Sequence, residues 1–435
     1  MLKRISQFIT YFSTIRFVQQ VIVSGASYFI LSVCGLIVNI VIANFYSADG
    51  LGYFQQVMSI YLIASTIASM GINSSLIKHA AENKDNQSQL QQCVSASVLL
   101  TIASSSVLLL LLYLTVWIFP NLKTGIINGF IGISWGLPLF ALNRTLLGLL
   151  NGLRKMNLFS FAQSLRWILI LLFIVIGIRL NLPVKKIILV FPCAEVMLTL
   201  LLVSVNLKNF SFFPPFSQMW VNVHFNYGIK TLLTNLAGEF NDKIDILVIG
   251  SIMGNSAAGI YSFTINVAKG LLVFSSIIQL NFSPLIAEYW SKRLFNELNG
   301  LIRIIFKYNL LIYFIVIIVA FFVYPLLLDL FITDPAILQS TSIFNILLLG
   351  VFFSSVFLFM GGFLTMSGFP TAQLIYMTIV VISGLGFIIA GASFFNLYGV
   401  ALAFLLNGIF TNVLLKFFIR KYTGIDIFQI VLQKS

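Results

Sequence analysis

About a dozen separate stretches of roughly twenty apolar residues run through this chain of 435 residues. A helix of about 20 residues spans a hydrocarbon core of roughly 30 Å, and in lipid every backbone amide must be satisfied internally, so such stretches form helices. The mean hydropathy is +1.03 and only 9% of the residues are charged, which no soluble domain of this size requires. The sequence therefore predicts an all-α membrane protein.

Hydropathy and turn residues predict about twelve helices, at residues 21–45, 53–77, 93–118, 126–150, 158–178, 187–206, 227–250, 258–286, 304–328, 341–366, 372–394 and 397–418. The connection at 207–226, with Pro214 and Pro215, separates six helices from six. We therefore predict two six-helix lobes, residues 1–212 and 213–435. Because each half crosses the membrane an even number of times, two related halves would share one orientation, as in parallel-repeat secondary transporters.

The basic residues of the connections are unevenly distributed. If the N-terminus is cytoplasmic, the inner loops and tails hold most of them, and the outer loops hold only Lys123, Arg179, Lys185 and Lys186. By the positive-inside rule we expect a multi-pass protein of the cell inner membrane with both termini in the cytoplasm. Basic loops beside anionic lipid head groups also explain much of the net charge of +13, so membrane lipids, and not nucleic acid, are the expected partners of these charges.

The connections leave no room for a catalytic domain. The longest hydrophilic ones, at 78–92, 207–226 and 287–303, are too short for a separate fold. No nucleophile with a base and no set of metal ligands stands out, and both His79 and His224 fall in predicted inner loops. We expect no catalytic residue, no metal and no cofactor, and hence a protein that is not an enzyme and works among its helices.

Basic side chains inside the predicted spans are candidates for function, since each costs at least about 2.5–3.5 kcal/mol at a helix centre. Lys230 and Lys416 lie near inner helix ends and can extend to the interface. Arg144 lies about two turns from an inner end, while Arg166 and Lys269 lie deeper. We therefore expect a functional role first for Arg166 and Lys269 and then for Arg144.

Acidic residues gather in the predicted seventh span. Glu239, Asp242, Lys243 and Asp245 lie within seven residues, at spacings that share one side of a helix. Two interpretations stay open: Lys243 neutralises a carboxylate and the cluster fixes the helix to its neighbours, or the acids relay protons or cations. Glu195 in the sixth span is a further candidate for ion coupling.

Amide side chains in the first two helices of each lobe are the candidates for hydrogen bonding to a polar ligand, and they are Asn39, Gln55, Gln56, Asn73, Asn235, Asn266, Gln279 and Asn281. Such residues also join membrane helices by hydrogen bonds worth about 0.6 kcal/mol on average in one well-studied case. About half of them can be explained by helix packing alone. Among the rest we single out Asn73 and Asn266.

Several short segments carry a family resemblance. They are the turn Gly52-Tyr53, the loop Leu149-Leu150-Asn151-Gly152-Leu153-Arg154-Lys155, the helix Asn241-Asp242-Lys243-Ile244-Asp245 followed by Met253-Gly254 and Ala258-Gly259-Ile260-Tyr261, and the late segments Gly362–Pro370 and Asn396–Ala401. In this order and spacing the chain resembles, over nearly its whole length, the Wzx-type polysaccharide (O-antigen) repeat-unit flippases of the multidrug/oligosaccharidyl-lipid/polysaccharide (MOP) exporter superfamily.

The resemblance implies two six-helix bundles around a central cavity that opens alternately to the two sides. It implies an undecaprenyl-diphosphate-linked oligosaccharide as substrate and a polysaccharide polymerase as a protein partner. On this reading Arg144, Arg166 and Lys269 balance the diphosphate charge, Asn73 and Asn266 bind sugar, and the four carboxylates couple transport to an ion.

Three other classes of membrane protein are alternatives to a polysaccharide repeat-unit flippase. A cation-coupled multidrug extruder shares the fold but is expected to present acidic and aromatic groups, so the deep Arg166 and Lys269 argue against it. A peptidoglycan-precursor flippase usually carries additional spans. A membrane-embedded polysaccharide polymerase or acyltransferase, the alternative from another class, favours a large outer loop or an intramembrane histidine, and neither is visible in this sequence.

Overall fold

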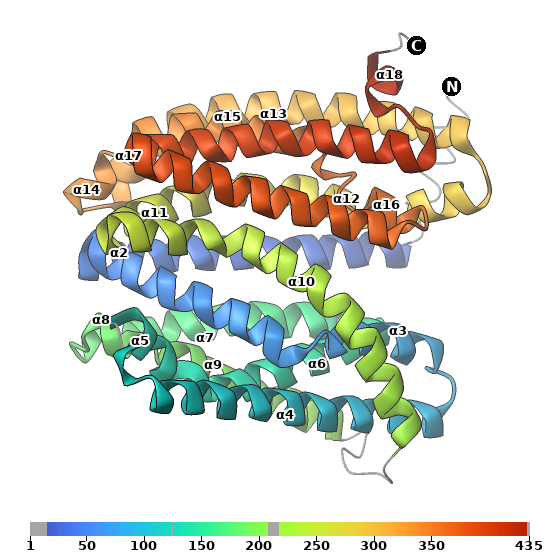
Figure 1. Ribbon diagram of the computed structural model, residues 1–435, viewed down its shortest axis with the longest axis horizontal. Helices are drawn as coiled ribbons and strands as arrows, with labels where there is room; N and C mark the ends of the chain where they lie inside the picture. The colour runs from blue at the N-terminus through green and yellow to red at the C-terminus, as the bar shows by residue number, and fades with distance from the viewer. Residues whose placement is uncertain (1–14, 123–124, 208–216, 433–435) are drawn as a thin grey trace. The chain divides into compact units, whose positions relative to one another are not determined.

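The computed structural model describes residues 15–122, 125–207 and 217–432 (Figure 1). Within these ranges every regular element is a helix, so the predicted all-α class is confirmed. The long helices are α2 (Ile15–Ser69), α4 (Gln87–Ile118), α6 (Leu137–Gly152), α7 (Met156–Arg179), α9 (Val190–Leu207), α10 (Gln218–Met253), α11 (Asn255–Leu271), α12 (Val273–Ser291), α13 (Phe295–Phe331), α15 (Thr341–Leu358) and α17 (Pro370–Thr423). The shorter ones are α3 (Ile72–Glu82), α5 (Gly125–Ile133), α8 (Val184–Ile187), α14 (Pro335–Leu338), α16 (Phe363–Met366) and α18 (Ile427–Leu432), with 3-10 turns η1 (Pro120–Leu122) and η2 (Ser134–Gly136).

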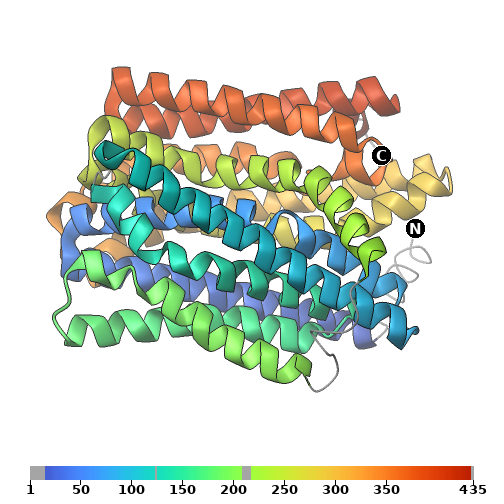
Figure 2. The ribbon, with the colours of Figure 1, turned by 60° about the horizontal axis from the view of Figure 1, so that its bottom comes forward.

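The two longest helices are hairpins. The backbone of α2 leaves the helical region at Ser47, with φ 61° and ψ 179°, and that of α17 leaves it at Asn396, with φ 54° and ψ −146°. The buried amide of Gln55 donates to Asn39 Oδ1 at 2.6 Å and joins the two arms of α2. Figures 1 and 2 show the orange and red arms of α17 running side by side. Each hairpin therefore supplies two of the predicted spans.

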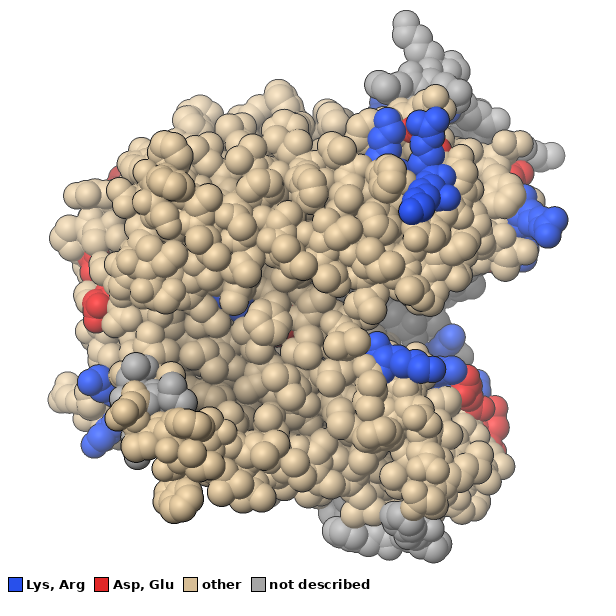
Figure 3. Space-filling view, in the orientation of Figure 1, with Lys and Arg blue, Asp and Glu red and all other residues tan. Residues whose placement is uncertain are grey.

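The described helices account for all twelve predicted spans. Eight of them are long and apolar enough to cross a membrane, and α11 and α12, bent by 43°, qualify as a further span when taken together. The count reaches twelve when the arms of α2 and α17 are taken separately and α10, which carries the charged residues of the predicted seventh span, is added. Figure 3 shows a face on which charged side chains form only small groups on an otherwise uncharged surface. Large apolar side chains such as Leu110, Trp117, Phe322 and Phe394 are exposed, as expected of a surface that faces lipid.

The chain folds into two compact units. Unit 1 comprises Met1–Val38 and Ile60–Leu236, and unit 2 comprises Asn39–Ser59 and Ala237–Ser435. The lobe boundary that we predicted at 212/213 lies outside the described residues, and the predicted lobes stay a prediction. The compact units divide the chain differently, since the first part of α10 belongs to unit 1 and the turn of the α2 hairpin belongs to unit 2.

Unit 1 is built around α6, which packs against α3, α4 and α9, while α7 packs against α9. Its core draws buried apolar side chains from α3, α4, α6, α9 and the start of α10: Leu76, Ala80, Leu90, Val94, Leu146, Leu150, Leu198, Leu202 and Trp220. The alignment of α6, α7 and α9 matters for function because each of them brings a polar residue to one buried place, described below.

Unit 2 is built around α15, which packs against α11, α13 and α17. Aromatic side chains fill much of its core, among them Phe282, Phe357, Phe359, Phe363, Tyr376 and Phe418. The short helix α18 packs on α13 and α17, and Asp426, which precedes α18, pairs with Arg420 at 3.4 Å. The C-terminal segment up to Leu432 is thus part of the fold of this unit.

The turn of the α2 hairpin packs tightly within unit 2. A Cβ atom on Gly52 would overlap the carbonyl oxygen of Asn255, and one on Gly259 would overlap the carbonyl oxygen of Ala48. Gly52 and Gly259, both in segments that carry the family resemblance, therefore lie where two backbones meet, and only glycine allows that approach. The carboxylate of Asp334 accepts the backbone N–H of Ala48 at 2.9 Å and so caps the second arm of α2.

Candidate functional site

A buried ion pair between α7 and α9 is the most completely formed polar site in unit 1. Arg166 Nε lies 2.8 Å from Glu195 Oε1, and Arg166 Nη2 donates to Glu195 Oε2 at 3.2 Å. The side chains are 12% and 3% exposed, so the carboxylate is enclosed and the arginine side chain keeps a small accessible part. The Nη2 contact is a charge-assisted hydrogen bond, whereas Nε lies close to the carboxylate without hydrogen-bonding to it.

Three further side chains surround this pair. Asn143 of α6 donates to Glu195 Oε2 at 2.7 Å, and the guanidinium of Arg166 lies over the ring of Phe140 at 4.6 Å from its centroid. Tyr61 of α2 packs edge-on against Phe140, and both Glu195 and Arg166 act electrostatically on its hydroxyl. Among the described residues neither the Tyr61 hydroxyl nor Asn143 Oδ1 has a hydrogen-bond partner. The site thus retains unused hydrogen-bonding capacity beside a paired charge.

A second ion pair of similar composition lies in unit 2. Lys269 Nζ of α11 lies 3.5 Å from Asp245 Oδ2 of α10 and donates to the backbone oxygen of Asp242 at 3.0 Å. The hydroxyl of Tyr261 donates to Asp245 Oδ2 at 3.3 Å, and the N–H of Ile246 donates to Asp245 Oδ1 at 2.8 Å. Asp245 is 4% exposed and Tyr261 is 1% exposed. Each unit therefore places a cation, a carboxylate and a buried tyrosine together.

The charged residues of the predicted seventh span differ in how deeply they are buried. Asp245 is buried, whereas the side chain of Asp242 is exposed, and Glu239 and Lys243 are half-buried. The ion pair that the structure gives Asp245 is with Lys269 of the next helix, while the packing interpretation had paired a carboxylate with Lys243. Sequence spacing along one helix could not reveal a partner on another helix.

The other predicted binding residues lie apart from these pairs. Arg144 of α6 is half-buried and donates from Nη1 to Thr66 Oγ1 at 2.9 Å. Asn73 lies in α3, and its Oδ1 is buried with no hydrogen-bond partner among the described residues. Asn266 lies half-buried in α11, one turn before Lys269. No contact tests the roles that we assigned to these three residues, so they stay predictions.

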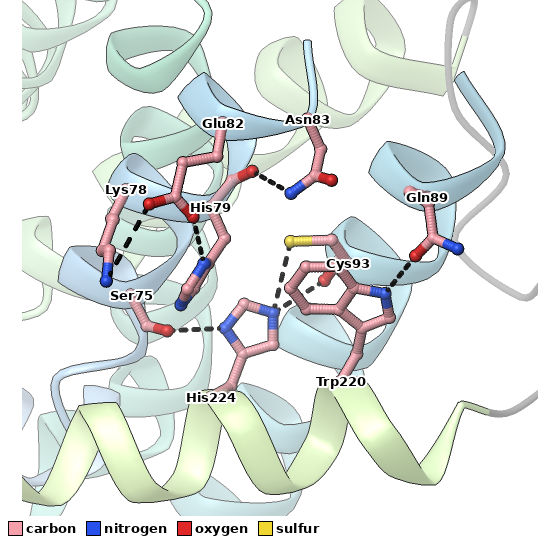
Figure 4. Close-up of polar contacts among 9 residues, drawn as sticks. All are labelled: Ser75, Lys78, His79, Glu82, Asn83, Gln89, Cys93, Trp220 and His224. Carbon is pink, nitrogen blue, oxygen red and sulfur yellow. Dashed lines mark hydrogen bonds and ion pairs between the residues drawn. The ribbon is translucent and has the colours of Figure 1, made fainter. Parts of the chain in front are cut away.

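A cluster of polar and aromatic side chains joins α3, α4 and α10 in unit 1 (Figure 4). We expected His79 and His224 in inner loops, and this expectation is wrong: both lie in helices, and His224 is fully buried. His224 Nε2 lies 3.0 Å from the backbone oxygen of Cys93 and Nδ1 lies 2.8 Å from Ser75 Oγ. Because a carbonyl can only accept, Nε2 carries the proton and Nδ1 accepts from the Ser75 hydroxyl.

The pKa of His224 is lowered to about 4, chiefly by burial and in smaller part by the nearby His79, while the hydrogen bond to the Cys93 oxygen opposes the shift. Trp220, one turn earlier, donates from Nε1 to Gln89 Oε1 at 3.1 Å, so two side chains fix the start of α10 to α4. Within the described part of the chain, no three His, Cys, Asp or Glu side chains are close enough to hold a metal ion. The cluster is therefore an anchor of α10.

Solved structures of membrane transporters share this fold. An inward-facing multidrug resistance MATE family transporter of the MOP superfamily has a TM-score of 0.74 at 14% identity, covering 95% of this chain and 100% of that chain. Lipid II flippase MurJ in an inward closed conformation has a TM-score of 0.72 at 15% identity, covering 94% and 90%. The MATE multidrug transporter DinF-BH has a TM-score of 0.70 at 15% identity, covering 96% of each chain. The chain is thus a multi-pass membrane protein with the fold of MOP-superfamily transporters.

Two sequence families match parts of the chain. The family described as polysaccharide biosynthesis protein matches residues 17–290, and the MatE family matches residues 231–390. No curated protein matches the chain. Since the first match covers more than half of the sequence, the chain belongs to the polysaccharide biosynthesis protein family.

Proposed function

We propose that this protein is an inner-membrane flippase that moves an undecaprenyl-diphosphate-linked oligosaccharide repeat unit from the cytoplasmic to the outer face, for the synthesis of a surface polysaccharide such as O-antigen. The observation that carries the proposal is the match to the polysaccharide biosynthesis protein family over residues 17–290. The fold shared with a lipid II flippase supports it, because that protein is named for the flipping of a lipid. Alternating access of the two lobes would provide the transport step.

The cationic side chains of both units suit this cargo. A diphosphate must be matched by positive charge before it can enter a medium of low dielectric constant, and guanidinium and ammonium groups provide that charge. Arg166 and Lys269 are partly buried, with 12% and 26% of their side chains exposed. Asn73 and Asn266 supply amide groups for the sugar, and Arg144 supplies a third positive charge.

The direct test is transport by the purified protein in liposomes. A fluorescent polyprenyl-diphosphate disaccharide is placed in the membrane, and its movement between leaflets is followed by protection from a membrane-impermeant quencher. We expect leaflet exchange to be faster than in protein-free liposomes and to be slowed by Arg166→Ala and by Lys269→Ala, because each change removes a cation that binds the diphosphate. Unchanged flipping in both variants at normal protein level would remove these residues from the mechanism.

A second candidate function is the cation-coupled extrusion of multidrug-type substrates. The MatE match over residues 231–390 and the shared fold of multidrug transporters favour it, and the carboxylates of α10 offer charge for a cationic ligand. The same liposomes, loaded with a fluorescent organic cation, distinguish the two functions. Flipping of the lipid diphosphate without efflux of the cation supports the flippase, and the reverse result supports the extruder.

A further inference from the structure

The guanidinium of Arg166 is already engaged in the structure. Its Nε and Nη2 contact both oxygens of Glu195, at 2.8 Å and 3.2 Å. A guanidinium binds a phosphate group through the same N–H groups. These donors cannot serve a carboxylate and a phosphate in full at the same time. A diphosphate that binds Arg166 through Nε and Nη2 therefore competes with Glu195.

We propose that Glu195 is an internal counter-anion: it occupies Arg166 in the empty carrier and yields it to the diphosphate of the cargo. The inference rests on the proposed flippase function and extends it to the step that follows release. A carrier that has released an anionic cargo is left with an unpaired cation in its interior, and an uncompensated buried charge is strongly destabilising. Glu195 removes that penalty, so the empty carrier can return to its starting conformation.

The surroundings of Glu195 fit a carboxylate that has two alternative states. When Arg166 turns to the cargo, Asn143 still donates to Glu195 Oε2, at 2.7 Å in this structure. The Tyr61 hydroxyl is buried and has no partner among the described residues, and the Tyr61 ring packs on Phe140, the ring over which the Arg166 guanidinium lies. We infer that this hydroxyl takes over as a donor to Glu195 when Arg166 turns to the cargo. A buried polar group without a partner is destabilising, and a purely structural ion pair would not require one.

Unit 2 contains the same combination of groups. Lys269 lies 3.5 Å from Asp245, and Tyr261 donates to the same oxygen of Asp245 at 3.3 Å. In this case the tyrosine is already hydrogen-bonded to the carboxylate, and the cation is held at a longer distance. Unit 2 thus shows a buried carboxylate that is held by a tyrosine and a backbone N–H while the cation lies at a longer distance, as we infer for Glu195 with Tyr61 and Asn143 once Arg166 has left.

Binding measurements provide the first test. Farnesyl diphosphate is titrated into the purified wild-type protein in lipid nanodiscs, into Glu195→Gln and into the matched control Glu288→Gln. Glu288 is exposed and pairs with Lys292 at 2.6 Å, so it represents a carboxylate outside the site. We expect Glu195→Gln to bind about tenfold more tightly, since the charged competitor for the guanidinium is removed. Glu288→Gln should bind like the wild type.

Transport measurements in liposomes provide the second test. Net flipping requires the return of the empty carrier, whereas exchange of labelled for unlabelled cargo does not. Glu195→Gln should therefore keep exchange and lose net flipping. Equal loss of both, or binding no tighter than in the wild type, would overturn the inference. Thermal unfolding of each variant shows that it is folded, and the shorter acid of Glu195→Asp should restore part of the net flipping.

Different experimental results would contradict the flippase function and the counter-anion role of Glu195. If neither the wild type nor any variant binds farnesyl diphosphate, the proposed function is wrong and the role of Glu195 falls with it. If the wild type binds and Glu195→Gln gains nothing, only the role of Glu195 is wrong. The double variant Arg166→Gln, Glu195→Gln should bind as weakly as Arg166→Gln alone, and a gain from Glu195→Gln in that background would contradict competition for Arg166.

Discussion

At the scale of single residues, Arg166 and Glu195 depend on each other for their burial. Removal of one partner of a buried ion pair leaves an uncompensated charge and typically costs about 3–5 kcal/mol, while removal of both is much less harmful. We expect Arg166→Ala to lower the thermal unfolding temperature strongly, and Arg166→Met with Glu195→Gln to recover most of the loss. Lys292→Ala, at an exposed pair, should change stability by less than about 0.5 kcal/mol. A similar small effect of Arg166→Ala would contradict the burial seen in the structure.

The buried His224 predicts a pH dependence of stability. Its pKa is lowered from 6.5 to about 4 by burial. The unfolded chain therefore binds more protons than the folded one between these values, so the histidine's contribution to stability is complete above pH 6.5 and is lost as the pH falls towards 4. Between pH 7 and pH 5 the loss amounts to about 2 kcal/mol.

Unfolding in detergent at several pH values measures this contribution. Other titratable groups in this cluster are His79 and Glu82, which contact each other at 2.8 Å, as well as Cys93, Lys78 and Tyr227. The wild type should lose stability between pH 7 and pH 5, and His224→Gln should show a flatter curve whatever its absolute stability. If the two curves are parallel, His224 takes up protons in the folded protein as readily as in the unfolded one, and the predicted lowering of its pKa is wrong.

At this scale the sequence identifies the charged residues of the helices but not their partners. A charge within an apolar span is visible in the sequence, which is why Arg166, Glu195, Asp245 and Lys269 were all found. Their pairing was not predictable, since Arg166 and Glu195 are 29 residues apart and meet only because α7 packs against α9. The roles were therefore divided between substrate and ion, whereas in each unit the structure pairs one residue of each kind.

At the scale of helices, the turn of the α2 hairpin depends on glycine. An alanine Cβ at position 52 would overlap the carbonyl oxygen of Asn255, which belongs to a backbone that cannot easily move. We expect Gly52→Ala to destabilise the protein by about 1–3 kcal/mol, the usual penalty of overpacking. Gly386→Ala is the matched control, because open space surrounds Gly386 in α17 and alanine is the better helix former. Thermal unfolding should separate the two variants, and equal stability would show that the hairpin turn can shift.

Helices made mostly of apolar residues were predictable from the hydropathy of the sequence. Helical segments of mixed polarity were less predictable. The breaks at Ser47 and Asn396 lie between predicted spans, as expected from the polar turn residues there. The start of α10 at Gln218 was predicted as a connection because its residues are mixed in polarity. Trp220 and His224, four residues apart on one helical face, are the signal that was missed, since both pack on the same neighbouring helices.

At the scale of the whole molecule, twelve spans determine which connections lie on which side of the membrane. Asn121, Asn255 and Asn396 follow odd numbers of spans, while Asn86 and Gln433 follow even numbers. The positive-inside rule then predicts the first three outside and the last two in the cytoplasm. Reporter fusions after each residue check these positions, and Asn209 in the connection between the two predicted lobes should also report the cytoplasm. A C-terminus on the outer side would contradict the division into six and six spans. The two halves would then not share one orientation, and alternating access by two related lobes depends on that orientation.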